Sequence, residues 1–165
     1  MRTELTRPTH RTTTTLVATT PHSSMFYEQR LEAPASPSAL REEYLADLET
    51  ILEGSGIDAA ATNTEIEAER LEAILEGDPI SLTLEEAASI QALGDGEPDP
   101  ETIETMACEH LLLGMTTAVL DVDTLAGDLE MDLDAKEVQQ KIERRAPMSF
   151  EEFVRVQYAI ANRTR

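Results

Sequence analysis

Apolar residues recur at helical spacing along almost the whole chain from Ser38 onward. In the stretch SALREEYLADLETILEG, which starts at that serine, they fall three or four residues apart on one stripe, and Gly54 is expected to end the helix. Alternating apolar and polar runs of strand length are absent from the sequence. The spacing predicts an all-α protein, with further helices over residues 57–62, 65–75, 84–93, 101–120, 122–129, 135–145 and 150–161.

The predicted helices form the same series twice. The segments TLEEAASIQAL and SFEEFVRVQYA each open with a capping box, in which Thr83 or Ser149 is the N-cap and a glutamate follows three residues later. The two segments also match at Gln91 and Gln157, and the apolar residues upstream correspond with a one-residue slip. We therefore expect two similar halves in tandem, each a long helix, two short helices and a closing helix.

Composition divides the chain further. Residues 1–24 hold nine threonines and no periodic apolar pattern, so we expect a disordered extension, with Met25 as an alternative start of the protein. The turn residues of GDGEPDP predict a linker between the halves. The expected organisation is an extension over 1–24, a linker over 25–38, a first half over 39–94, a linker over 95–100 and a second half over 101–163.

The charge is distributed unevenly. Residues 25–135 carry 28 acidic side chains and only 3 basic ones, whereas residues 136–165 carry 7 basic and 4 acidic ones. The chain has 2 lysines against 11 arginines, at a net charge of −20. An acidic, lysine-poor composition is suited to a salt-rich cytoplasm, where self-repulsion is screened over a Debye length of about 3 Å at 1 M salt.

The sequence indicates a cytoplasmic location. Cys108 is the only cysteine, so an intramolecular disulfide is impossible. The longest apolar run, HLLLGMTTAVL, is shorter than the roughly 20 residues that a membrane span needs, and no secretory signal of apolar residues is present.

The second half resembles the helix-turn-helix of phage repressors. Its TLAGDL matches the opening of the second helix in that family, KEVQQKIERR matches the glutamine-rich recognition helix, and MSFEEFVRVQYAI matches the closing helix. The sequence departs from the family pattern in the turn, at Glu130 and Met131, and at Arg144. The resemblance implies a transcription-associated DNA-binding protein without enzymatic activity, whose predicted DNA contacts are Lys136, Gln139, Gln140 and Arg144.

Helical projection of residues 135–145 supports two interpretations. Val138 and Ile142 point toward a core, which leaves glutamine and cationic side chains on the outer face, and these can pair with bases and phosphates. The alternative is a solvated, well-capped helix, because Asp134 lies at its start and cations lie in its last turn, where each contributes about 0.3–1 kcal/mol. In that case the protein is a degenerate module that serves only association with another protein or with itself, which the acidic first half also favours.

From Met25 to the C-terminus the chain also resembles a family of small haloarchaeal proteins of unknown function. The segments that carry this resemblance are MFYEQR, ALREEY, LTLEEAASIQAL, CEHLLLGMTTAVLDVDTLA and KEVQQKIERRAPMSFEEF. It supports the high-salt interpretation and implies no activity.

Motifs for catalysis and for metal binding are missing from the sequence. Cys108 and His110 lie about 200° apart on a helix and cannot share a metal. The acidic stretch DVDTLAGDLEMD lacks the glycine and ligand positions of a calcium loop, and no phosphate-binding loop or nucleophile elbow is present. We expect no enzyme, cofactor, metal or small-molecule substrate.

The acidic composition predicts salt-dependent folding. Because the 28 carboxylates of residues 25–135 repel one another when unscreened, stability should rise as KCl is raised from dilute to molar. Thermal melts followed by circular dichroism measure this, and a melting temperature that is flat across the range would contradict the halophilic interpretation.

Overall fold

The computed structural model describes residues 25–163, which contain eight helices and no strand. The all-α prediction is confirmed, and the predicted extension over residues 1–24 lies outside the described residues. Within the described chain, no helix combines the length and the apolar character needed to cross a membrane. The helices are α1 Pro37–Ser55, α2 Ile57–Thr64, α3 Ala68–Leu75, α4 Leu84–Gln91, α5 Pro100–Thr117, α6 Val122–Asp128, α7 Ala135–Ile142 and α8 Phe150–Arg163.

The two halves follow the same order of helices and share special backbone positions. The long helices α1 and α5 both begin with proline after a capping residue, Ser36 or Asp99. Positive φ angles recur at corresponding points, at Gly56 and Val119, at Glu65 and Glu130, and at Gly77 and Arg144. Helix α1 continues past Gly54 and ends at Gly56, because only the latter has the left-handed φ, of 83°, that closes the helix.

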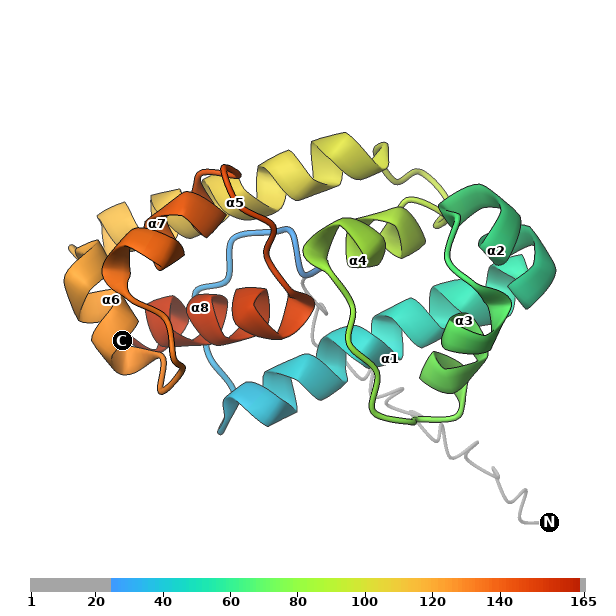
Figure 1. Cartoon of the computed structure of the whole chain (residues 1–165), viewed down its shortest axis with the longest axis horizontal. Coiled ribbons are helices and arrows are strands. Elements are labelled where there is room, and N and C mark those ends of the chain that lie inside the picture. The colour runs from blue at the N-terminus through green and yellow to red at the C-terminus, as the bar shows by residue number, and fades with distance from the viewer. Residues whose placement is uncertain (1–24, 164–165) are drawn as a thin grey trace, which may run out of the picture.

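A short antiparallel bridge joins the halves at equivalent residues. Thr83 pairs with Ser149, and both are N-caps of closing helices. The Leu84 N–H donates to the Met148 carbonyl at 2.9 Å, and the Phe150 N–H donates to the Leu82 carbonyl at 2.8 Å. Both predicted capping boxes are formed. The paired loops thus place the starts of α4 and α8 side by side at the centre of the molecule (Figure 1).

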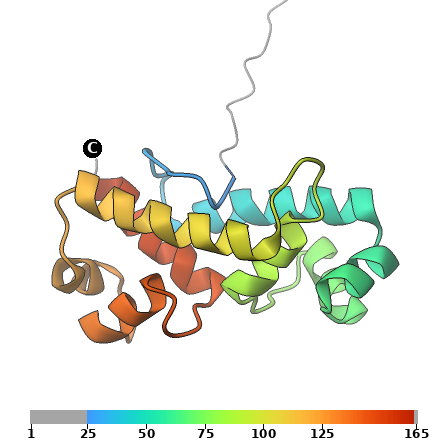
Figure 2. The same ribbon diagram turned by 90° about the horizontal axis from the view of Figure 1, so that it is seen from above.

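The halves interlock around one continuous hydrophobic core. The long helix of each half packs against the closing helix of the other half as well as its own. Helices α2 and α3 lie at one end of the molecule, and α6 and α7 lie at the opposite end (Figures 1 and 2). Gly114 of α5 permits a close approach to α8, since a Cβ atom there would lie 2.7 Å from Ile160 Cγ2.

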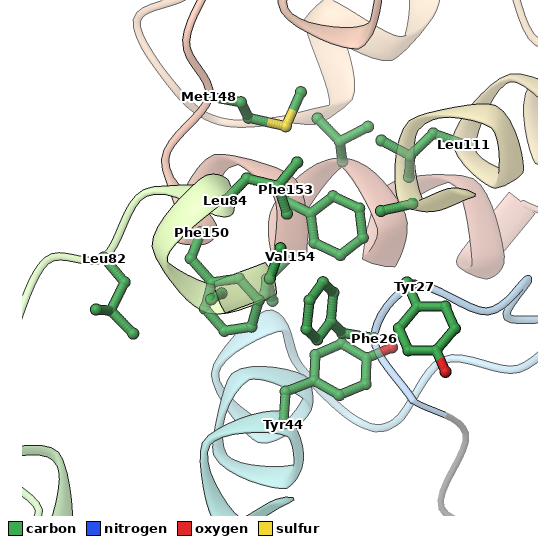
Figure 3. Packing of buried hydrophobic residues seen from close by; sticks show 14 of the residues in the cluster. Phe26, Tyr27, Tyr44, Leu82, Leu84, Leu111, Met148, Phe150, Phe153 and Val154 are labelled. Carbon is green, nitrogen blue, oxygen red and sulfur yellow. The ribbon is translucent and has the colours of Figure 1, made fainter. Parts of the chain in front are cut away.

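The segment before α1, expected only as a linker, contributes to the core. Phe26 is 2% exposed and makes edge contacts with the rings of Tyr27, Tyr44, Phe150 and Phe153. Figure 3 shows this ring at the centre of the cluster. Five of the six aromatic residues of the chain therefore meet around one side chain.

Hydrogen bonds from α5 and α8 hold the same segment. Gln157 Nε2 donates to the Phe26 carbonyl at 3.0 Å, and the hydroxyl of Tyr44 donates to Gln157 Oε1. His110 Nδ1 lies 2.6 Å from the carbonyl oxygen of Tyr27. Burial of Tyr44 raises the pKa of its hydroxyl to about 12, so it stays protonated as a donor at neutral pH.

The turns after α1 and α5 have the same left-handed conformation but different residues, Gly56 and Val119. Val119 is 93% exposed and has a φ of 53°, a conformation that is strained for a β-branched side chain. Glycine holds the corresponding position after α1. Val119→Gly should stabilise the protein by roughly 0.5–1 kcal/mol and raise the melting temperature by about 2 °C.

The reverse substitution in the first half, Gly56→Val, is the matched control and should destabilise the protein by more than about 1 kcal/mol. A lower melting temperature for Val119→Gly would show that the left-handed turn after α5 is not strained.

Candidate interaction surfaces

The four predicted DNA-contact residues lie on or just after α7. Val138 and Ile142 are buried as predicted, and Lys136 and Gln139 are exposed. Gln139 Nε2 donates to Glu143 Oε1 at 3.0 Å, one turn further along. The side chains of Lys136 and Gln140 form no hydrogen bond or ion pair with the described residues.

Arg144 contacts α5 rather than extending the outer face of α7. Its guanidinium donates to the hydroxyl of Thr105 and lies 3.6 Å from a carboxylate oxygen of Glu104. Its φ of 62° turns the chain away from the helix axis, so the side chain leaves the face that Lys136 and Gln140 share. The structure therefore does not bring all four predicted residues onto one free surface.

Nearly every cation of the described chain has an acidic partner. Residues 25–163 contain nine lysines and arginines, and eight of them form salt bridges. The exception is Lys136. By contrast, the glutamates around α3 are exposed, namely Glu65, Glu67, Glu69, Glu72 and Glu76. The described basic residues near the C-terminus thus mainly form salt bridges within the chain.

Two of the salt bridges, which we call the cation clasps, involve the loops that the bridge joins. In the first clasp, Arg70 Nη2 donates to the Ser81 carbonyl at 2.7 Å and to Glu86 Oε1 at 3.0 Å. In the second, Lys141 Nζ donates to the Pro147 carbonyl at 2.9 Å and to Glu152 Oε1 at 3.0 Å.

Each cation clasp therefore joins a loop carbonyl to the glutamate of a capping box. The hydrogen bond from Arg70 lowers the pKa of Glu86 below its usual value. Burial opposes ionisation of Glu152, but hydrogen bonds from Ser149 and Lys141 outweigh it and lower the pKa of that carboxyl as well.

In each loop, the carbonyl and the glutamate that the clasp joins lie five residues apart, from Ser81 to Glu86 and from Pro147 to Glu152. Within residues 25–163, no group of three or more His, Cys, Asp or Glu side chains is placed to hold a metal ion. In each loop, the cation of the clasp donates hydrogen bonds to both this carbonyl and this carboxylate.

Cys108 lies beside the second cation clasp. It is 4% exposed, and burial together with the charge of Glu104 raises the pKa of its thiol to about 11. A buried thiol that stays protonated is a poor nucleophile. Its surroundings are those of a core residue.

The loops also border hollows in the surface. Two adjoining hollows of about 530 and 400 Å³ run between α1 and the loop before α4, and they share Arg41, Ile80 and Leu82 in their linings. A hollow of about 230 Å³ lies between α5 and the loop before α8, lined by Arg144 and Met148 among others. None of the three hollows was predicted from the sequence, because each is lined by residues that are far apart in the chain.

The chain matches a family of unknown function (DUF5791) over residues 40–163 and belongs to that family. Neither the curated proteins nor the solved structures gave a match. Family membership thus covers all eight helices except the first turn of α1 and leaves the biochemical activity open.

The second cation clasp predicts a pH-dependent effect. Glu152→Gln keeps an oxygen for the Ser149 N–H but removes the negative charge opposite Lys141, so it should destabilise the protein by roughly 1–2 kcal/mol at pH 7. Because the pKa of Glu152 is lowered on folding, its stabilising effect exists above the unfolded pKa of about 4.3 and is lost as the pH falls further. The difference between variant and wild type should shrink below about pH 4, as measured by urea unfolding in molar KCl.

Glu109→Gln, at an exposed position of α5, is the control and should leave stability nearly unchanged at both pH values. A Glu152→Gln difference of the same size at pH 7 and at pH 3 would show that charge does not contribute to the clasp.

Proposed function

We propose that this family member is a non-enzymatic protein-association module that works in a salt-rich cytoplasm. The observation that carries the proposal is the pairing of eight of the nine described cations with acidic partners. What remains free on the surface is mostly carboxylate, including the five glutamates around α3. Such a surface repels a polyanion and favours a partner with basic and apolar side chains.

Because most of the described cations are paired with carboxylates, binding of nucleic acid is also disfavoured. Affinity for DNA comes largely from lysines and arginines that neutralise phosphates and release counterions, and molar salt removes most of that gain. Arg144 and Lys141 would have to leave Glu104 and Glu152 to contact phosphate. The connection from α6 to α7 spans residues 129–134, longer than the three- to four-residue turn of a helix-turn-helix.

DNA binding through Lys136, Gln139, Gln140 and Arg144 is the second candidate. It is favoured by the free side chains of Lys136 and Gln140 on α7. The exposed hydrogen bond between Gln139 and Glu143 is worth only about 0.2–0.5 kcal/mol, so Gln139 can exchange it for an adenine.

Parallel selections in molar KCl test the two candidates. Wild-type protein is presented with an array of random peptides and with fragments of haloarchaeal genomic DNA. We expect reproducible enrichment of particular peptides, and poor recovery of DNA that is the same for wild type and for a variant with alanine at residues 136, 139, 140 and 144.

Sequence-specific recovery of DNA that the alanine variant loses, at about 1–3 kcal/mol per bidentate contact, would favour the second candidate. The absence of any enriched peptide would count against association with a peptide segment.

A further inference from the structure

The two hollows beside α1 form one groove, which we call the α1 groove. Their linings share five residues, three of which are Arg41, Glu42 and Ile80. The groove runs from the start of α8, at Phe150, past the loop before α4 to the end of α3, at Ile74. With hollows of about 530 and 400 Å³, it has room for several side chains of a bound segment.

The lining of the α1 groove combines an apolar floor with an acidic rim. Apolar side chains come from α1, α3 and the loop, and those of Leu45 and Ile80 are only half-buried. The acidic residues in the lining, which together we call the rim, are Glu42, Glu49, Asp78 and Glu151.

Arg41 is the only cation in the lining of the α1 groove. Its charge is already used, because its guanidinium lies 3.1 Å from a carboxylate oxygen of Glu151 and donates to the Ile80 carbonyl. The groove therefore presents a net negative charge around apolar surface.

The internal repeat supplies a comparison for this groove. The hollow beside α5 is its counterpart, since Met148 and Leu84 there correspond to Leu82 and Phe150 in the α1 groove. The counterpart measures only about 230 Å³.

The two grooves differ in the residue at one backbone position. Arg144 crosses from the loop to Glu104 and Thr105 on α5 and spans its own groove. Gly77 holds the corresponding left-handed position in the first half, and a Cβ atom built there meets nothing within 4 Å. An arginine thus crosses each groove, Arg41 from α1 to the Ile80 carbonyl and Arg144 from the loop to α5, and the groove with glycine at the turn is the larger one.

We infer that the α1 groove binds a segment of a partner protein in which leucine or isoleucine side chains are flanked by lysine or arginine. The apolar side chains would cover Ile80 and Leu45, and the flanking cations would approach Glu42 and Asp78. This inference rests on the proposed association function and names the site and the partner chemistry.

A binding titration tests the inference. The probe is a fluorescein-labelled peptide of leucines flanked by arginines, and its counterpart has glutamate in place of arginine. Fluorescence anisotropy in 0.5–2 M KCl should show at least tenfold tighter binding of the arginine peptide by wild-type protein, with affinity falling as salt rises.

Two variants with the same change of net charge locate the site. Glu42→Lys with Asp78→Lys reverses the rim of the α1 groove and should weaken binding of the arginine peptide at least tenfold. Glu53→Lys with Glu109→Lys changes exposed positions outside the groove and should change the affinity less than twofold. Circular dichroism melts confirm that both variants are folded.

The outcomes separate the groove from the broader function. If the array selects peptides whose binding the rim reversal does not weaken, the groove inference is wrong and the association function stands. If neither the array nor the arginine peptide shows binding, the association function fails as well. A wild-type dimer in sedimentation that the rim reversal dissociates would overturn the partner assignment, because the occupant would then be a second copy of the chain.

Discussion

The main-chain bridge between Thr83 and Ser149 is the contact on which the arrangement of the two halves depends. It joins residues that hold the same place in each half, so it relates the closing helices by a local two-fold rotation. Each loop is fixed from its own side by a capping box and a cation clasp. The core around Phe26 then forms where the closing helices, the long helices and the segment before α1 meet. The two hydrogen bonds of the bridge therefore join loops that a capping box and a cation clasp hold on each side.

The distribution of charge follows from the same arrangement. Cations are scarce in a chain of net charge −20, and several of them join separate elements: Arg70 joins α3 to α4, Lys141 joins α7 to α8, and Arg163 joins α8 to α6. The Lys141–Glu152 pair is the most buried of the three, so salt screens it less than the exposed Arg163–Asp128 pair. Salt bridges therefore account for most of the described cations near the C-terminus, and among these Lys136 alone has no acidic partner.

Local features could be predicted from the sequence, and contacts between distant segments could not. Apolar spacing and capping residues act within a few positions, which is why the helices and both capping boxes were predicted correctly. Phe26 lies in a segment without helical spacing, so nothing local indicated that it would be buried. The predicted contact at Arg144 illustrates the opposite difficulty, because a helical projection places a residue on a face only while the helix lasts. That residue lies beyond the end of α7, at a positive φ.

An internal repeat separates what the fold requires from what it permits. Where the halves share a feature, as at the capping boxes and at the bridge, the fold depends on it in both places. Where they share a backbone conformation but not a side chain, the fold leaves the choice free. Gly77 and Arg144 are such a pair, and each contributes to the lining of the groove in its own half. Arg144 gains partners on α5 but adopts a φ that is unfavourable for a residue with a Cβ atom, whereas Gly77 adopts the same conformation without that cost. Either residue therefore satisfies the fold, and the difference between them changes what the surface beside the turn presents to the solvent.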